Sequence, residues 1–167
     1  MVQIHNKDLE EAAQKGMDEF LKVITDAYLK EVDGDITAEN IDKLNGYQHT
    51  LLALRFFMDE VNQGGFVQLI QNGYGGYVFD NPTAKSLKLM GAAGLSKILY
   101  KAKEIYDANR AELERETSEE EFNAMYVDFE VFDELEEKLF FIEEEELSIV
   151  AQYVDENMED FAEIIED

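Results

Sequence analysis

A glycine-rich stretch in the middle of the chain is the first candidate for chemistry. It reads EVNQGGFVQLIQNGYGGY over residues 60–77 and holds five of the ten glycines. Glycine clusters often cradle phosphates, but a P-loop also needs a Lys followed by Ser or Thr, and no Lys or Arg lies between Arg55 and Lys85. The dinucleotide-binding pattern needs a preceding strand and a glycine where this chain has Val78. The stretch therefore argues against phosphate binding.

The same glycines are better explained as breaks between helices. Gly64 is expected to end one helix in the left-handed conformation, Gly65 to let the chain reverse, and Phe66 to start a new helix against the core. We favour this interpretation. In the alternative, neighbouring side-chain amides line a small polar site or tie down the loop; these are Asn62, Gln68 and Asn72.

Other familiar sets of reactive residues are incomplete. Residues 33–39 begin like a calcium loop, but Ala38 replaces the required Gly and Leu44 the closing Glu. Neither His5 nor His49 has a Glu three residues before it, as a carboxylate-bridged di-iron bundle needs, and His49 is expected to be a hydrogen-bonded core histidine. With no Cys and no Gly-x-Ser-x-Gly elbow, nucleophilic catalysis lacks its usual parts. The sequence predicts no catalytic residues, no metal site and no cofactor.

The acidic residues are concentrated in the last third of the chain. Residues 111–167 carry 23 acids against 2 bases, and so −21 of the formal net charge of −25. Such a block is often a disordered tail, but here apolar residues recur at spacings of three or four, as on one side of a helix. This apolar seam consists of Phe132, Leu135, Leu139, Ile142, Leu147, Val150, Val154, Met158, Phe161 and Ile165. An ordered acidic surface on a helical support is therefore predicted.

The acids fall mostly off this seam, and carboxylates three or four residues apart on a helix lie about 5–6 Å from one another. Such a surface repels DNA and RNA, so direct nucleic-acid binding is not expected. It attracts basic DNA-binding proteins, whose surfaces complement the one negative charge per about 1.7 Å of duplex DNA. In the alternative interpretation, the acidic residues only keep the protein soluble and bind no partner. The predicted partner-binding face comprises Glu130, Asp133, Glu134, Glu137, Glu143, Glu144, Glu145, Asp155, Glu156 and Glu159.

The elements that must position this face are expected to be helices. The apolar periodicity predicts an all-α fold of seven to nine helices in a single domain over residues 1–167, of which 110–167 form the strongly acidic helical part. Asp8–Val32 is expected to form one amphipathic helix and Tyr47–Val61 the central core helix. A short helix over Phe66–Asn72 follows the paired glycines.

Local signals predict where the later helices begin. Asn81 followed by Pro82 is typical of a helix start, and Gly94 is expected to interrupt the chain before the next helix, residues 95–114. Ser118 with Glu121 three residues later is a capping box, which predicts a helix start in the acidic part. Acids near the N-terminus and the polar residues between 61 and 79 argue against secretion and membrane insertion, so a cytoplasmic protein is expected.

Residues 44–92 resemble the signature of a bacterial domain family, the DMP type, best known for an acidic DNA-mimic protein. The pattern is EVxNGGF-x-Q-x-x-x-N, with Gln63 where the family usually has Asn. It is carried by Glu60, Asn62, Gly64, Gly65, Phe66, Gln68 and Asn72. The resemblance implies an all-α, homodimeric cytoplasmic protein that masks the DNA-binding surface of a transcription regulator.

The leading hypothesis is therefore a non-enzymatic DNA mimic that binds a basic protein, such as a DNA-binding transcription regulator, through its acidic C-terminal third. Two rivals stay open. An immunity-type protein that neutralises a basic toxin would have the same electrostatics. A small-molecule-binding protein or enzyme would instead have a polar pocket at Asn62, Gln68 and Asn72.

Overall fold

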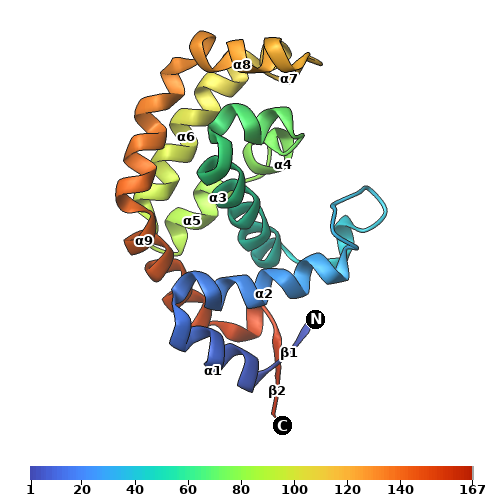
Figure 1. Ribbon diagram of the computed structural model, residues 1–167. Helices are drawn as coiled ribbons and strands as arrows, with labels where there is room; N and C mark the ends of the chain where they lie inside the picture. Colours follow the sequence, from blue (N-terminus) through green and yellow to red (C-terminus); the bar gives the residue numbers. More distant parts are fainter. Residues whose placement is uncertain (167) are drawn as a thin grey trace.

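The computed structural model describes residues 1–166 and consists mainly of helices (Figure 1). In chain order the elements are β1 (Gln3–His5), α1 (Asn6–Lys15), α2 (Met17–Glu31), the 3-10 turn η1 (Ile41–Lys43), α3 (Gly46–Gln71), α4 (Gly75–Phe79), α5 (Thr83–Leu89), α6 (Ala93–Ala108), α7 (Arg110–Glu114), α8 (Glu119–Asp128), η2 (Glu130–Phe132), α9 (Asp133–Glu156), η3 (Met158–Asp160) and β2 (Glu163–Ile165). The predicted all-α class is confirmed, with nine α-helices and two three-residue strands among the described residues.

Helix α3 lies at the centre, and α9 runs along one edge of the molecule with α6 beside it (Figure 1). Helices α7 and α8 lie at one end, and α1 and α2 at the other. Strands β1 and β2 pair in parallel, with Ile4 opposite Ile164, so the first and last segments lie side by side. The Phe161 carbonyl accepts hydrogen bonds from the Tyr28 hydroxyl at 2.8 Å and the Gln48 amide at 3.0 Å. The end of the acidic third is thus tied to α2 and α3.

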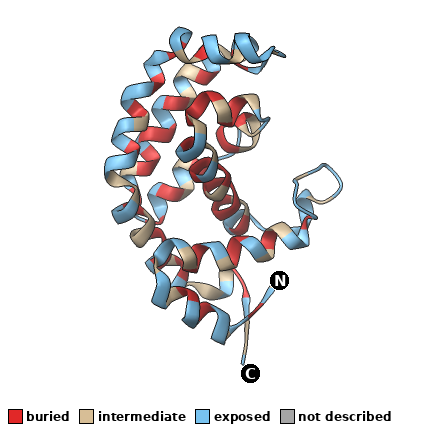
Figure 2. Ribbon diagram, in the orientation of Figure 1, coloured by how far each residue is buried: buried red, intermediate tan, exposed pale blue. Residues whose placement is uncertain are grey.

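The buried side chains form a continuous cluster that includes the acidic third (Figure 2). Phe66, fully buried in α3, stacks on Phe57 with ring centroids 5.7 Å apart and on Phe132 of η2 at 5.2 Å. Aromatic rings bury more apolar area than other side chains, so this stack strongly favours docking of η2 and α9 on α3. The high charge of residues 111–167 does not separate them from the rest of the core.

Several predicted helix boundaries are wrong. The helix expected over Asp8–Val32 is divided at Gly16 into α1 and α2. Gly94 lies inside the first turn of α6, and the helix expected to run to 114 is divided at Asn109 into α6 and α7. At Gly16 and Asn109 one amphipathic periodicity continues across a bend that tertiary packing introduces, because a seam of apolar residues does not reveal a change of helix axis.

The local capping signals had mixed outcomes. The Ser118 hydroxyl accepts from the Glu121 N–H and the Glu121 carboxylate from the Ser118 N–H, both at 3.2 Å, so the predicted capping box at the start of α8 is confirmed. At α5, however, Pro82 itself takes the cap position, and the Asn81 amide donates to the Tyr77 carbonyl, 2.9 Å away in α4. The preceding helix satisfies Asn81 in place of the helix it was expected to cap.

Candidate functional site

Helix α9 supports the predicted acidic surface. Leu135, Leu139, Val150 and Val154 are buried along one side of it, against α6, α2 and α3. Because this apolar seam is fixed in the core, the opposite side of the helix is held facing solvent. The predicted seam therefore places the acids of α9 on a rigid support.

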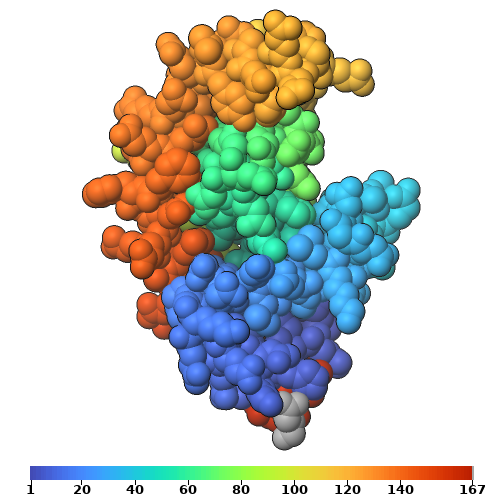
Figure 3. All heavy atoms as spheres, viewed as in Figure 1, coloured from blue at the N-terminus to red at the C-terminus, as the bar shows by residue number. Residues whose placement is uncertain are grey.

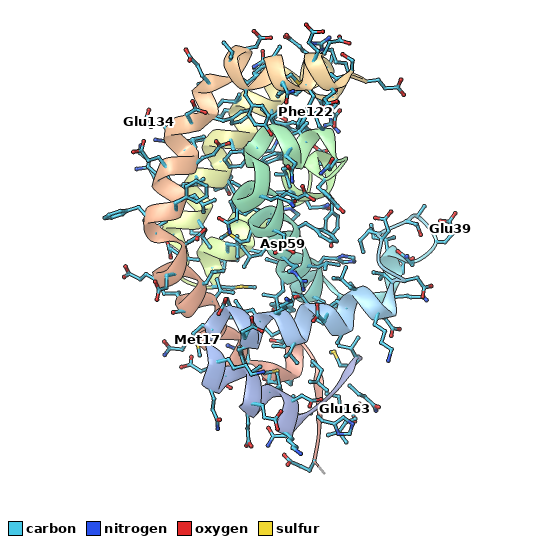
Figure 4. All side chains as sticks on the ribbon, in the orientation of Figure 1. Met17, Glu39, Asp59, Phe122, Glu134 and Glu163 are labelled. Carbon is cyan, nitrogen blue, oxygen red and sulfur yellow. The ribbon has the colours of Figure 1, made fainter. Side chains whose placement is uncertain are left out.

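The structure leaves nine of the ten predicted acids exposed. Seven of them lie on α9 and form what we call the outer acidic face: Asp133, Glu134, Glu137, Glu144, Glu145, Asp155 and Glu156. Residues of α9 make up the edge of the molecule in Figure 3, and the labelled Glu134 points away from the core in Figure 4. An ion pair with Lys138 at 3.1 Å lowers the pKa of Glu134. The other carboxylates of this face are exposed to water.

Three predicted acids lie off this face. Glu130 is exposed in η2, directly before α9, and Glu159 is in η3, beside a pocket at the start of α3. Glu143 is half-buried in a groove between α2, α3 and α9 that Asn62 also lines. Burial raises the pKa of Glu143. Its position on the inner side of α9 means that it contributes little to a surface a partner could contact.

Two further glutamates of α9, which the sequence interpretation did not single out, point inward and receive backbone hydrogen bonds. Glu136 accepts from the Phe66 N–H at 2.8 Å, and Glu146 accepts from the Leu95 N–H at 3.1 Å. Phe66 starts the second half of α3 and Leu95 lies in the first turn of α6, where N–H groups lack helical partners and negative charge is favoured. We call these two the anchor glutamates. Ten residues apart, they fix α9 at points about 15 Å from each other.

Each anchor glutamate lies over a glycine. Gly65 has φ +76° and breaks α3, and a Cβ there would overlap the Glu136 carboxylate. A Cβ on Gly94 would overlap the Glu146 carboxylate in the same way. The left-handed residue is therefore Gly65 and not Gly64 as predicted; Gly64 has φ −152° and its carbonyl accepts from the Tyr126 hydroxyl at 2.8 Å. Both glycines leave room for a carboxylate from the acidic third.

The polar residues of the family signature connect the two halves of α3. Glu60 accepts from the side-chain amides of Gln68 at 2.8 Å and Asn72 at 2.9 Å, across the break at Gly64 and Gly65. Gln68 also donates to the Gln63 side chain at 2.9 Å. These amides tie down the helix break, which is one of the two roles that the sequence left open for them.

A separate hollow of about 640 Å³ lies at the start of α3. His49 lies in its wall, half-buried, with Nδ1 2.7 Å from the Tyr77 hydroxyl. Its Nε2 donates to the Ile41 carbonyl at 2.7 Å, since a carbonyl can only accept. The expected hydrogen-bonded histidine is thus at the edge of the core. Among residues 1–166 no group of three or more His, Asp or Glu side chains is arranged to hold a metal ion.

The described helices include none that is both long and apolar enough to cross a membrane.

The spacing of the seam contained a signal for one anchor glutamate. Glu146 is four residues from both Ile142 and Val150, so a strict helical repeat passes through it. Nothing local marks Glu136, because α9 turns this residue toward α3, whose break is 71 positions earlier in the chain.

The geometry can be set beside known proteins. Residues 42–157, which include all of α3, both anchor glutamates and the outer acidic face, match the family model described as DMP19-like protein. The chain is 32% identical over 158 residues to a protein named DNA mimic protein DMP19 from Neisseria meningitidis serogroup B, covering 93% of this chain and 94% of that protein. The family resemblance seen in the glycine-rich signature is confirmed, and the chain belongs to the DMP19-like protein family.

Proposed function

We propose that this protein is a non-enzymatic DNA mimic of the cytoplasm, whose outer acidic face binds the DNA-binding surface of a basic protein such as a transcription regulator. The observation that carries this proposal is the rigid row of carboxylates on α9. Its seven acids span the 24 residues of α9, which is an average of one carboxylate per about 5 Å of helix axis, against one phosphate per 3.4 Å along one DNA strand. A protein surface that binds DNA phosphates would therefore contact a similar, somewhat lower density of negative charge on α9.

The way α9 is held supports a binding role. A solvated tail that only improves solubility needs no fixed geometry. Here the anchor glutamates and the buried seam hold the carboxylates in place, so a partner would not have to order them. The name of the Neisseria relative, DNA mimic protein, supports the same role. The homodimer implied by the resemblance of the glycine-rich signature would present two outer acidic faces together.

The proposal is tested by a pull-down from the native lysate at low salt, with retained proteins identified and then challenged with duplex DNA. We expect a basic DNA-binding protein to be retained, to elute as NaCl rises, and to be displaced by DNA, because both ligands would use one surface. If no basic protein is retained at low salt, the proposal is wrong.

Matched charge variants locate the binding surface. Neutralising four acids of the outer acidic face should abolish retention; the variant is E134Q/E137Q/E144Q/E145Q. Neutralising four exposed acids of the N-terminal region should not, although it changes the net charge equally; that control is E11Q/D18N/E31Q/E39Q. Equal losses in both variants would mean that net charge, and not this face, governs binding.

The rivals make different predictions in these experiments. An immunity-type protein would retain a basic toxin that duplex DNA does not displace. A small-molecule-binding protein or enzyme would use Asn62, Gln68 and Asn72, but the amides of Gln68 and Asn72 donate to Glu60 of their own chain, and Asn62 is exposed. No specific observation favours that rival.

A further inference from the structure

The outer acidic face is interrupted near its middle by two aromatic side chains. Between Glu137 and Glu144, about 10 Å of helix carries no carboxylate on this face. The exposed residues in the gap include Phe140, 51% exposed, and Phe141, 91% exposed. DNA has no apolar group in its phosphate row, so a plain copy of phosphate charge does not account for these rings.

Charged residues surround Phe141 on the helix. Its neighbours three and four positions away, which share its side of a helix, are Glu137, Lys138, Glu144 and Glu145. A surface selected only for solubility would place a polar side chain at this most exposed position. An apolar side chain inside a charged ring instead resembles the centre of a protein interface, where a buried aromatic is enclosed by polar contacts.

Phe141 also forms one wall of an apolar groove between α6 and α9. The groove has a volume of about 530 Å³ and is floored by Ile98, Leu135 and Ile142. Its rim carries Lys97, Lys101 and Lys138 together with Glu134 and Glu137, and Lys138 pairs with Glu134 at 3.1 Å. The surface therefore combines an apolar floor, an exposed aromatic ring and rim charges of both signs.

This combination of charge and apolar surface defines the ligand. A uniformly cationic strand would be attracted by the glutamates but would leave Phe141 and the apolar floor of the groove in water. A helix with basic residues on one side and apolar residues beside them satisfies both, since an amphipathic helix places its apolar stripe in a groove between two helices. Bilayers with anionic lipid are disfavoured, because the outer acidic face repels them.

We propose that Phe141 is the aromatic anchor of this surface, and that the partner contributes an amphipathic basic helix whose cations meet Glu137, Glu144 and Glu145 while its apolar side chains cover Phe141 and enter the groove. This inference rests on the proposed function and adds the kind of element that the basic partner presents. It predicts that part of the affinity is apolar and insensitive to salt.

Two synthetic helical peptides of about 18 residues, roughly 27 Å long, test the inference. They carry the same lysines on one side and differ in having Leu or Ala beside them. Dissociation constants are measured at about 50 and 200 mM NaCl, where charge contacts weaken and apolar contacts persist. The wild-type protein is expected to bind the Leu peptide more tightly than the Ala peptide, with the same salt dependence for both.

The variant F141A should lower the affinity for the Leu peptide about 30-fold, which is the loss typical of an aromatic anchor. It should leave the affinity for the Ala peptide and the salt dependence of binding almost unchanged. The matched control L89A removes another exposed apolar side chain, 75% exposed on α5 and outside the groove, and should change neither affinity. The charge variant E137Q/E144Q/E145Q should lower the affinity for both peptides about tenfold, because each exposed ion pair contributes little. It should also reduce the salt dependence of binding.

The outcomes separate the inference from the proposed function. If the charge variant loses binding but F141A keeps the preference for Leu, the aromatic anchor is wrong and the acidic interaction stands. If the charge variant binds both peptides like the wild type, the proposed function fails. If F141A instead turns a dimer into a monomer in light scattering, Phe141 is a contact between two copies of the chain and the inference is overturned.

Discussion

The inner and outer sides of α9 carry the same residue type under opposite conditions. On the inner side, Glu136 and Glu146 lose much of their water and receive backbone N–H groups at helix starts. On the outer side, Glu137 and Glu145, one position away from each, remain hydrated and have no backbone donor. A single residue step along a helix therefore separates a glutamate that stabilises the fold from one that repels its neighbours.

The difference shows how the chain orders a surface that opposes folding. Close carboxylates on the outer acidic face repel more in the folded protein than in the expanded chain. The buried seam, the Phe66 stack and the anchor glutamates offset this, and leaving a buried N–H without its acceptor would cost about 1–3 kcal/mol. The signature and the acidic helix are thus one unit, since Gly65 is the site on which Glu136 docks.

The largest effect should come from closing the space that an inner glutamate occupies. G65A forces a left-handed φ on an alanine and pushes its Cβ into the Glu136 carboxylate, so we expect a loss of about 3–4 kcal/mol in the free energy of unfolding, measured with urea. G73A is the matched control, because Gly73 has φ +90° with no atom within 4 Å of a Cβ, and should cost about 1 kcal/mol. Equal losses would mean that Gly65 serves backbone conformation alone.

Removing an inner acceptor directly should have the next largest effect. E146A leaves the buried Leu95 N–H unpaired and should destabilise the protein by about 2 kcal/mol in urea unfolding. E145A, one residue away on the outer acidic face, should stay within about 0.5 kcal/mol of the wild type. E146Q, which retains an oxygen acceptor, should lie between them. If E145A is as harmful as E146A, the two sides of α9 do not differ as described.

Which features of α9 could be predicted from the sequence depended on how far apart the contacting residues lie along the chain. The seam from Leu135 to Val154 and the capping box of Ser118 are set by neighbours within four residues, and both were predicted. The docking of Glu136 on Phe66 joins residues 70 positions apart, and no local pattern encodes it. The outer acidic face was therefore predictable nearly residue by residue, and the seam spacing carried a signal for the anchor Glu146, whereas the anchor Glu136 could not be predicted.

Added salt should change the stability of the protein through the outer acidic face of α9 and not through the anchor glutamates. NaCl screens repulsion between exposed carboxylates, so the melting temperature should rise with added salt, by about 3 °C for each kcal/mol of repulsion removed. The variant E134Q/E137Q/E144Q/E145Q should melt higher at low ionic strength and respond less to salt than the wild type. A melting temperature that falls steadily with NaCl would show that attractive ion pairs dominate this surface.

The smallest expected effect is the pH dependence of the anchor Glu136. Burial raises the pKa of Glu136 above its ordinary value of 4.5, and the hydrogen bond from the Phe66 N–H opposes this only partly. The folded state thus holds the proton more tightly than the unfolded chain, so this group's contribution to stability is full below about pH 4.5 and is lost as pH rises through its raised pKa. E136Q keeps an acceptor oxygen but cannot ionise, so its stability relative to the wild type should increase from about pH 4.5 to pH 7 in urea unfolding. E136A, which leaves the Phe66 N–H unpaired, should be less stable than E136Q at both pH values. A wild-type advantage over E136Q that grows with pH would show that the fold needs the charge of this glutamate and not only its oxygen.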